Sequence, residues 1–272
     1  MKKVYVFLIV IILSALHAEA RTIRVGPAES VTQIKQAITM AQSGDTILVR
    51  ASIYREGNII LQKSIVLIGE GYPILDGENE YETLTVHAQN AVIQGLKFIN
   101  TGTGSIEDKA AIKILDSNNL RILNNQFENT FFGIYLSNSS HIWIENNELK
   151  SEAEAENQIG NGIHLWKCHH ITINENKIRG HRDGIYFEFV TNSLITNNYS
   201  EGNMRYGLHF MFSHNDEYRD NTFINNGAGV AVMYTKGVKM INNHFIHNWG
   251  SSSYGLLLKD ISDSFVTGNE FV

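Results

Sequence analysis

The segment RYGLHFMFSHND contains a histidine and a methionine two positions apart, His209 and Met211. In a β-strand such residues lie on the same side, while Leu208 and Phe210 lie on the other. A second methionine, Met233, follows 22 residues after Met211. Thioether sulfur is a soft, neutral ligand that selects Cu(I), and imidazole also binds copper. If folding brings these side chains together, they form a candidate Cu(I) site.

Further side chains could contribute to such a site. Met204 and His214 lie just before and just after the predicted strand, and His164 occupies the equivalent of the His209 position two repeats earlier. Zinc is not favoured, because zinc sites use thiolates, imidazoles and carboxylates. In the alternative interpretation, the two methionines only pack beneath a loop. A metal site requires that residues 22 apart in the sequence become neighbours in space.

A repeat that runs along the chain meets this requirement. Each of seven small residues that precede an aliphatic residue is followed 14 positions later by an asparagine. The intervals from each asparagine to the next small residue are 8, 15, 8, 9, 8 and 12 positions. The commonest of these, 8, added to the constant 14 gives a basic period of 22 residues. A period of about 20 to 50 residues indicates a solenoid. The small residues are Ala111, Gly133, Gly162, Gly184, Gly207, Gly229 and Gly255, and the asparagines are Asn125, Asn147, Asn176, Asn198, Asn221, Asn243 and Asn269.

Within each repeat the apolar residues alternate with polar ones and do not recur at helical spacing. Short alternating segments that are broken by Asn, Ser and Gly indicate strands joined by tight turns. Only two prolines occur in the chain, so little interrupts these strands. We therefore predict an all-β fold, a single-stranded parallel β-helix of the pectin-lyase-like type with a short N-terminal cap helix. The chirality rule for parallel crossovers makes it right-handed.

Stacking of equivalent residues in a β-helix creates columns with distinct roles. Positions one and three after each small residue are apolar throughout and are predicted to line the core. The asparagines are predicted to form a buried amide ladder at a bend, and the glycines to give the backbone room at a corner. Positions two and four are predicted to face solvent. Met211 would then lie beside Met233, with His209 on the same face about 7 Å from Met211.

The N-terminal residues follow the pattern of a secretory signal peptide. Lys2 and Lys3 precede an apolar run, and small residues end the segment before Arg21. The apolar run is short for a bilayer span, and no second long apolar stretch follows. We therefore expect residues 1–20 to direct export and to be cleaved.

The β-helix is predicted to occupy the rest of the chain, residues 21–272. In VTQIKQAITMAQ the apolar residues have helical spacing, which predicts an amphipathic helix in a cap of about residues 28–45. Coils then extend over about residues 46–272. The sequence stops just past the last asparagine repeat without a capping segment, and we expect this end to be truncated.

Composition disfavours some functions. The chain has 22 basic and 28 acidic residues, and without residues 1–20 its formal charge is −7. An acidic chain without a basic run is a poor candidate for nucleic-acid binding, so no such partner is expected. Cys168 is the single cysteine, so no internal disulfide can form. It aligns with serines of a turn column and is predicted to fill space; a metal role with the adjacent His169 and His170 is the alternative.

Several segments resemble the NosD family of periplasmic β-helix proteins. They are KSIVLIGEGYPILDG, RDGIYFEF and SSYGLLLKD, and, more specifically, RYGLHFMFSHND and GVAVMYTKGVKMINN. The resemblance covers nearly all of the chain after the signal peptide, although NosD proteins usually continue for several more coils. It implies a non-catalytic periplasmic protein that supplies copper or sulfur for the copper sites of nitrous-oxide reductase. It also implies partnership with a membrane ABC transporter, a periplasmic copper chaperone and the reductase. His209, Met211 and Met233 lie in the matching motifs and are the candidates for transient Cu(I) binding.

Two other functions are compatible with the predicted fold. Many right-handed β-helices act on polysaccharides as lyases, epimerases or hydrolases, and Trp166 and Tyr186 could stack on sugar rings. Hydrolysis needs two carboxylates that flank one bond, but Glu188 is the single carboxylate in the outward columns. Asp183 and Asp216 are predicted to be turn residues. A carbohydrate-binding or carbohydrate-active protein is therefore the alternative, and a solenoid that only binds another protein is a third hypothesis.

Overall fold

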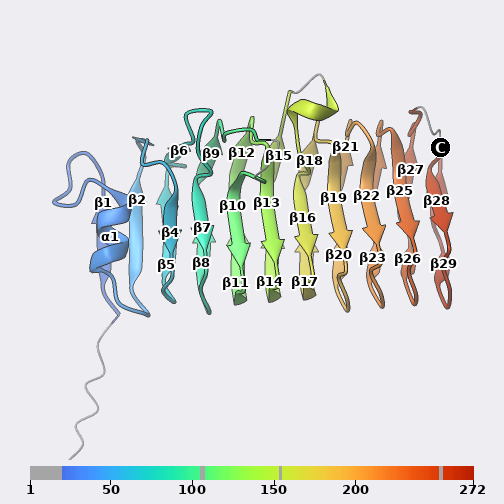
Figure 1. Ribbon diagram of the computed structural model, residues 1–272, viewed down its shortest axis with the longest axis horizontal. Helices are drawn as coiled ribbons and strands as arrows, with labels where there is room; N and C mark the ends of the chain where they lie inside the picture. The colour runs from blue at the N-terminus through green and yellow to red at the C-terminus, as the bar shows by residue number, and fades with distance from the viewer. Residues whose placement is uncertain (1–19, 105–107, 153–154, 251–253) are drawn as a thin grey trace, which may run out of the picture.

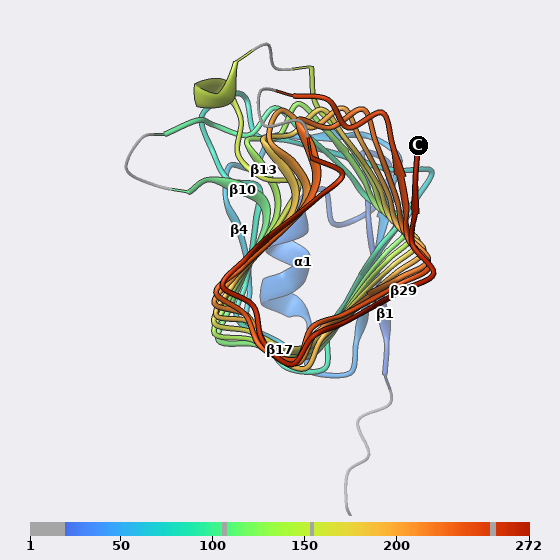
Figure 2. The same cartoon turned by 90° about the vertical axis from the view of Figure 1, so that its right-hand side faces the viewer.

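A computed structural model of the chain describes residues 20–104, 108–152, 155–250 and 254–272. Residues 1–19 of the predicted signal peptide lie outside the described residues. The described residues form a right-handed parallel β-helix (Figure 1), which confirms the predicted fold class. Viewed along the axis, successive coils lie almost directly behind one another (Figure 2).

Successive coils contribute strands to three parallel sheets, which we call A, B and C. Sheet A contains β1 (Thr22–Val25), β2 (Thr46–Arg50), β5 (Val66–Glu70), β8 (Val92–Gln94), β11 (Asn118–Leu123), β14 (Ser140–Glu145), β17 (His169–Asn174), β20 (Leu194–Thr196), β23 (Glu217–Arg219), β26 (Lys239–Ile241) and β29 (Phe265–Thr267). Sheet B contains β3 (Ile53–Tyr54), β6 (Ile74–Asp76), β9 (Lys97–Ile99), β12 (Gln126–Glu128), β15 (Glu148–Lys150), β18 (Lys177–Arg179), β21 (Tyr199–Glu201), β24 (Thr222–Ile224), β27 (His244–Ile246) and β30 (Glu270–Phe271). Sheet C contains β4 (Ile59–Leu61), β7 (Leu84–Val86), β10 (Ala110–Leu115), β13 (Phe132–Ser137), β16 (Ile163–Trp166), β19 (Asp183–Glu188), β22 (Tyr206–Met211), β25 (Ala228–Met233) and β28 (Leu256–Lys259).

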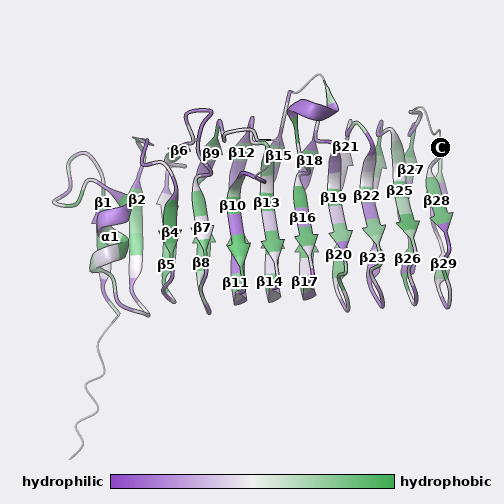
Figure 3. Cartoon of the chain, in the orientation of Figure 1, coloured by the Kyte–Doolittle hydropathy of each residue, from purple (hydrophilic) through white to green (hydrophobic). Residues whose placement is uncertain are grey.

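The inward residues of the three sheets form one continuous core. Positions one and three after each small residue are fully buried from Ile112 to Val232, as predicted. Leu258 is 42% exposed, because it lies in the last described coil and no further described coil packs on it. Apolar residues follow the strands and many polar residues lie in the turns (Figure 3).

The predicted asparagine ladder is confirmed at the corner between sheets A and B. In six consecutive pairs, from Asn125 to Asn269, the Nδ2 of one asparagine donates to the Oδ1 of the next at 2.9–3.1 Å. The same Oδ1 accepts the main-chain N–H of the preceding asparagine. The ladder therefore ties each coil to the next by two hydrogen bonds inside the protein.

A second, shorter ladder lies five residues further along each coil and was not predicted. Asn203 donates to Asn226, and Asn226 to Asn248, at 2.8 and 3.0 Å. His181 occupies the equivalent position one coil before Asn203, and its main-chain N–H donates to Asn203 Oδ1 at 3.0 Å. Burial lowers the pKa of His181 to about 4, so its imidazole is neutral at neutral pH.

The glycine column gives the chain room where sheet C begins, as predicted. A Cβ on Gly184 would lie 2.3 Å from Ser200 Oγ and 2.6 Å from Gly207 O, closer than van der Waals contact allows. Most length variation lies on the neighbouring corner, between sheets B and C. There the longest insertion carries a short 3-10 helix, η1 (Glu156–Gln158), which projects from the solenoid (Figure 1).

The N-terminal end of the core is covered as predicted, but by a shorter helix. Helix α1 (Ile34–Met40) buries three apolar side chains, and the carboxylate of Glu56 accepts the main-chain N–H groups of Ile34 and Lys35 at 2.7 and 2.9 Å. Strand β1, which was not predicted, precedes α1 and pairs with β2. Among the described residues, no helix combines the length and apolarity that a bilayer-spanning helix needs.

One buried carboxyl group, that of Asp216, lies at the corner between sheets C and A. Asp216 Oδ1 accepts the main-chain N–H of Ser193 at 2.9 Å, but Oδ2 has no hydrogen-bond partner among the described residues. Burial therefore raises the pKa of Asp216 to about 8. Ser193 and Ser264 occupy equivalent positions in other coils, where their neutral hydroxyl groups accept main-chain N–H groups.

Removal of one rung of the asparagine ladder should destabilise the fold. Asn198→Ala deprives the amides of Asn176 of their acceptor and leaves buried main-chain groups unpaired. We expect the free energy of unfolding to fall by about 2–4 kcal/mol in chemical denaturation. The control Asn157→Ala, at an exposed position in η1, should change it by less than about 0.5 kcal/mol. Equal effects of the two substitutions would contradict this role of the ladder.

Asp216→Ser should stabilise the protein in a pH-dependent way. The unfolded chain ionises this carboxyl group near pH 4, whereas the folded protein keeps its proton until about pH 8. Stability is therefore lost as the pH rises between these values. We expect the variant to gain on the order of 1 kcal/mol or more of unfolding free energy at about pH 8, and little at about pH 4. Denaturation curves across this range measure the gain; a gain that does not vary with pH would refute the assignment.

Candidate metal centre and its aromatic surroundings

The two methionines of the candidate site are neighbours, as predicted. Met211 ends β22 and Met233 ends β25, and the two residues are register partners on adjacent strands of sheet C. Both side chains are half-buried on the outer face of the sheet. The structure therefore places two thioethers side by side at the corner where sheet C turns into sheet A.

His209 lies two residues before Met211 in β22. Its side chain was predicted to face solvent, but in the structure it is buried. Only 4% of the residue is exposed, and its register partner Ala231 is fully buried. The imidazole packs against the rings of Tyr186 and Tyr206, with ring centroids 4.9 and 4.6 Å away. Large neighbours on the same face thus cover a residue that points away from the core.

Asp183 fixes the orientation of the buried imidazole. Its Oδ2 lies 3.4 Å from His209 Nδ1, and its Oδ1 accepts the main-chain N–H of Tyr206 at 3.3 Å. Asp183 was predicted to be a turn residue; it is instead the fully buried first residue of β19, and Arg205 Nε lies 3.7 Å from its Oδ1. A carboxylate only accepts hydrogen bonds, so Nδ1 of His209 is the donor in this contact, and in the neutral ring the lone pair is then on Nε2.

The Nε2 atom of His209 is buried and has no hydrogen-bond partner among the described residues. Burying a polar nitrogen without a partner is unfavourable, and such an atom fits a site that is completed by a ligand. Asp183 and Tyr206 lie toward the start of the strands, whereas Met211 lies toward their end. An ion shared by His209 and the two methionines would therefore be bound through Nε2.

The three additional ligand candidates have different surroundings. Met204 is half-buried in the turn before β22. His214 accepts the main-chain N–H of Lys236 through Nδ1 at 3.1 Å. His164 lies between the rings of Tyr135 and Tyr186, with centroids 4.8 and 4.9 Å away. Burial and, to a smaller extent, the charge of Arg182 lower the pKa of His164 to about 3, so it is neutral.

Four consecutive coils supply one row of contacting rings on the outer face of sheet C, formed by Tyr135, His164, Tyr186 and His209. The first pair is stacked, the second is tilted and the third meets edge to face. The sequence places these residues in one column, but their continuous contact was not predicted. Burial and the nearby Glu188 raise the pKa of Tyr186 to about 12. Each ring in this row therefore packs against at least one neighbouring ring.

A second aromatic ladder lies directly beside the methionines and was missed. Phe189, Phe212 and Tyr234 follow Glu188, Met211 and Met233 in the sequence. Their rings stack with centroids 5.4 and 5.0 Å apart, and Phe189 and Phe212 are 44% and 39% exposed. All three have positive φ angles, of 56°, 50° and 57°. Bulky residues are rare in this conformation, and other coils hold Asp116, Asn138 or Asp260 there. The sequence signal that could have revealed this ladder is an aromatic residue at the same corner position in three successive coils.

Cys168 fills space, as predicted. Its Sγ lies 3.4 Å from the carbonyl oxygen of Trp166, the relation that Ser139 Oγ has to Ser137 one coil earlier. Burial raises the pKa of the Cys168 thiol to about 11, so it is not a thiolate. No three His, Cys, Asp or Glu side chains in the described part of the chain already converge as a metal centre. The His209, Met211 and Met233 set is of another kind, because two of its members are thioethers.

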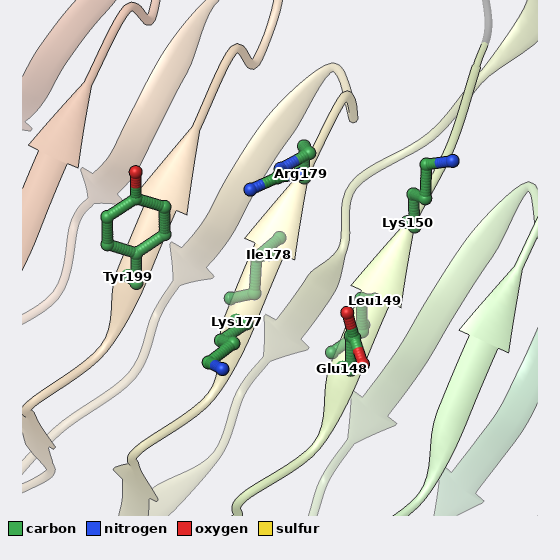
Figure 4. Close-up of a pocket in the computed structure, with 7 residues that line it drawn as sticks. All are labelled: Glu148, Leu149, Lys150, Lys177, Ile178, Arg179 and Tyr199. Carbon is green, nitrogen blue, oxygen red and sulfur yellow. The ribbon is translucent and has the colours of Figure 1, made fainter.

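A small hollow on the outer face of sheet B offers no comparable chemistry. It is lined by Glu148, Leu149, Lys150, Lys177, Ile178, Arg179 and Tyr199 (Figure 4). Its volume is about 30 Å³, which is enough for about one water molecule. Register pairing places Glu148 beside Lys177, and Arg179 pairs with Glu201 at 2.6 Å. Lys150 pairs with Glu152 at 2.7 Å, so two of the three basic side chains of the hollow already have a carboxylate partner.

The described residues form a right-handed parallel β-helix, and solved structures agree with this fold. The polygalacturonase of Erwinia carotovora ssp. carotovora superimposes with a TM-score of 0.65 at 11% identity, covering 93% of this chain and 94% of that one. The A-module of the Azotobacter vinelandii mannuronan C-5 epimerase AlgE6 gives 0.61 at 14% identity, covering 87% and 80%. At such identities the likeness concerns the fold alone.

The sequence comparison is more specific for the C-terminal half. Residues 150–272 match the family described as "Periplasmic copper-binding protein (NosD)", and residues 32–155 match "Right handed beta helix region". Two proteins named "Probable ABC transporter binding protein NosD" are similar: that of Stutzerimonas stutzeri is 24% identical over 131 residues, and that of Pseudomonas aeruginosa 28% over 130. Each match covers 47% of this chain and 30% of the relative. The resemblance to NosD is confirmed, and His209, Met211 and Met233 all lie in the matching segment.

The exposed aromatic ladder should contribute little to stability. Phe212→Asn loses two ring contacts, each worth about 0.5–1.5 kcal/mol, but relieves a backbone conformation that costs a bulky residue about 1–2 kcal/mol. We expect its free energy of unfolding to stay within about 1 kcal/mol of the parent. The control Phe210→Ala, in the adjacent core column, should lose about 3–5 kcal/mol. A comparable loss of unfolding free energy in both variants would show that the ladder stabilises the fold and would contradict this prediction.

Proposed function

We propose that this chain is a non-catalytic periplasmic binding protein of the NosD kind, with Cu(I) as its cargo. The observation that carries the proposal is the pairing of Met211 with Met233 on the face that also holds the unpartnered Nε2 of His209. The match to a copper-binding family over residues 150–272 supports it, because that segment contains all three residues. Copper would be the transported substrate, held transiently.

The chemistry of these three side chains suits Cu(I). Two thioethers and a neutral imidazole form a soft, uncharged ligand set, which favours Cu(I) over Zn²⁺ or Mg²⁺. Asp183 holds the His209 ring by its other nitrogen, as carboxylates do for many metal-binding histidines. The methionines are only half-buried, which leaves them accessible to a donor or an acceptor protein. Met204, His214 or His164 are candidates for a further ligand.

The partners follow from the resemblance. The names of the two relatives associate them with an ABC transporter, and we propose that this chain also works with membrane ABC transporter subunits. A periplasmic copper chaperone would supply the ion, and nitrous-oxide reductase would receive copper or sulfur during assembly of its copper sites. The stacked Phe189, Phe212 and Tyr234, which lie beside the methionines, support protein contact at this corner.

A carbohydrate-binding or carbohydrate-active protein is the second candidate. The shared fold of the polygalacturonase and the epimerase favours it, as do Trp166, Tyr186 and Glu188 on the outer face of sheet C. Two observations weigh against it. Asp183, which could have been a second carboxylate, is fully buried, and the faces of Tyr135 and Tyr186 pack on neighbouring rings and not on open solvent.

Competition with a Cu(I) chelator tests the proposed function. The variant His209→Ala, Met211→Leu, Met233→Leu should bind Cu(I) at least about 100-fold more weakly than the parent, because loss of an outer partner alone costs 10- to 100-fold. Asp183→Asn should weaken binding less, since it changes only the support of the ring. The control His87→Ala, Met40→Leu, with both residues exposed and far along the chain, should bind as the parent does.

Equal Cu(I) affinity in the parent and the site variant would refute the assignment. A glycan array and a uronate-cleavage assay examine the second candidate in parallel. Binding or cleavage that is lost in Trp166→Ala, Glu188→Gln would favour the carbohydrate function, whereas an absence of any response to sugars would argue against it.

A further inference from the structure

Three exposed histidines gather at the corner between sheets C and A, away from the methionines. His141 belongs to β14, and His169 and His170 begin the next strand of sheet A, β17. The rings of His141 and His170 are stacked, with centroids 4.9 Å apart. His169 lies 5.1 Å from His170 and 5.9 Å from His141. Each imidazole is therefore in contact with the other two.

The backbone brings these rings together in an unusual way. Consecutive residues in a strand point in opposite directions, but His170 has a φ of 55°, which breaks the alternation and leaves both His169 and His170 exposed. His141 has the same conformation, with a φ of 53°. Other coils fill this column with Asn119, Asn192, Asn215 or Gly237. The fold therefore does not require histidine here, and two successive coils nevertheless have it.

The nitrogen atoms have a spacing that suits a shared ion. His169 Nδ1 and His170 Nδ1 lie 2.9 Å apart. Two nitrogens that each lie about 2.0–2.1 Å from one metal ion, at a right angle, are separated by about 2.9 Å. His141 Nδ1 lies 3.1 Å from Asn118 Nδ2, and the exposed ring is free of the core. The three rings do not already converge as a metal centre, so binding of a shared ion would require the exposed His141 ring to rotate about its own side-chain bonds.

We propose that His141, His169 and His170 form a surface site for a divalent transition-metal ion, with Cu(II) bound most tightly. Imidazole ligands suit copper, nickel and zinc, and among divalent first-row ions Cu(II) generally has the highest affinity. His169 and His170 lie two coils from Met211 along the axis, about 10 Å, and His141 lies one coil further. The site does not depend on the Cu(I) assignment, since it shares no ligand with it.

Titration of the untagged chain with Cu(II), with glycine as competitor, tests this site. The variant His141→Asn, His169→Thr, His170→Asn gives these positions the residues of a neighbouring coil, Thr191 and Asn192, and should fold normally. We expect it to bind Cu(II) at least about 100-fold more weakly than the parent. The parent complex should show electron paramagnetic resonance couplings to more than one imidazole nitrogen, and the variant should lose them.

Two controls separate this site from others. His87→Asn removes an exposed histidine elsewhere, one that lies 3.7 Å from Asp116, and should leave Cu(II) affinity unchanged. The His209→Ala, Met211→Leu, Met233→Leu variant should also keep the Cu(II) signal, so failure of the Cu(I) proposal would be recognised independently. Equal Cu(II) affinity in the parent and the three-histidine variant, or couplings to a single imidazole only, would overturn the inference.

Discussion

The hydrogen bond from one asparagine side chain to its counterpart in the next coil is the interaction on which the rest of the structure depends. It connects successive coils at the corner between sheets A and B, and it satisfies main-chain groups that would otherwise be buried without partners. This constraint explains the constant 14-residue interval, because both the small residue and the asparagine are held against their equivalents. At the turn from sheet B to sheet C, only some coils are connected by such asparagine hydrogen bonds. The long insertions occur at this turn.

Stacking of this kind separates the outer surface from the core. One residue per coil enters each outward column, so Met211, Met233 and the aromatic ladder beside them can occupy three successive coils without any change in the inward residues. The three histidines likewise occupy outward positions that vary without a change in the core, since other coils have polar turn residues there. Both groups of candidate ligands lie at or near the corner between sheets C and A, where positive φ angles turn the side chains of His141 and His170 outward. Thioether and imidazole side chains are thereby presented along one edge of the solenoid.

The sequence predicts the repeat, the core columns and the pairing of Met211 with Met233, because each follows from a fixed interval between residue types. It does not predict that His209 is buried. Alternation indicates the side of a strand on which a residue lies, but Tyr206 and Tyr186 determine what covers it, and their ring positions depend on side-chain packing. Asp183 was misplaced for a similar reason, since a carboxylate beside glycine resembles a turn. Phe189, Phe212 and the His141–His170 contact were missed because positive φ angles break the alternation on which the prediction was based.

The asparagine ladder also has a direction. In all six pairs the amide nitrogen belongs to the earlier coil and the oxygen to the later one. The side-chain dipoles therefore align head to tail along the axis, and each polarises the next. Reversal of a single amide would set nitrogen against nitrogen on one side and oxygen against oxygen on the other. The row consequently has one permitted orientation as a whole, and the solenoid acquires an electrical polarity that its net charge does not reveal.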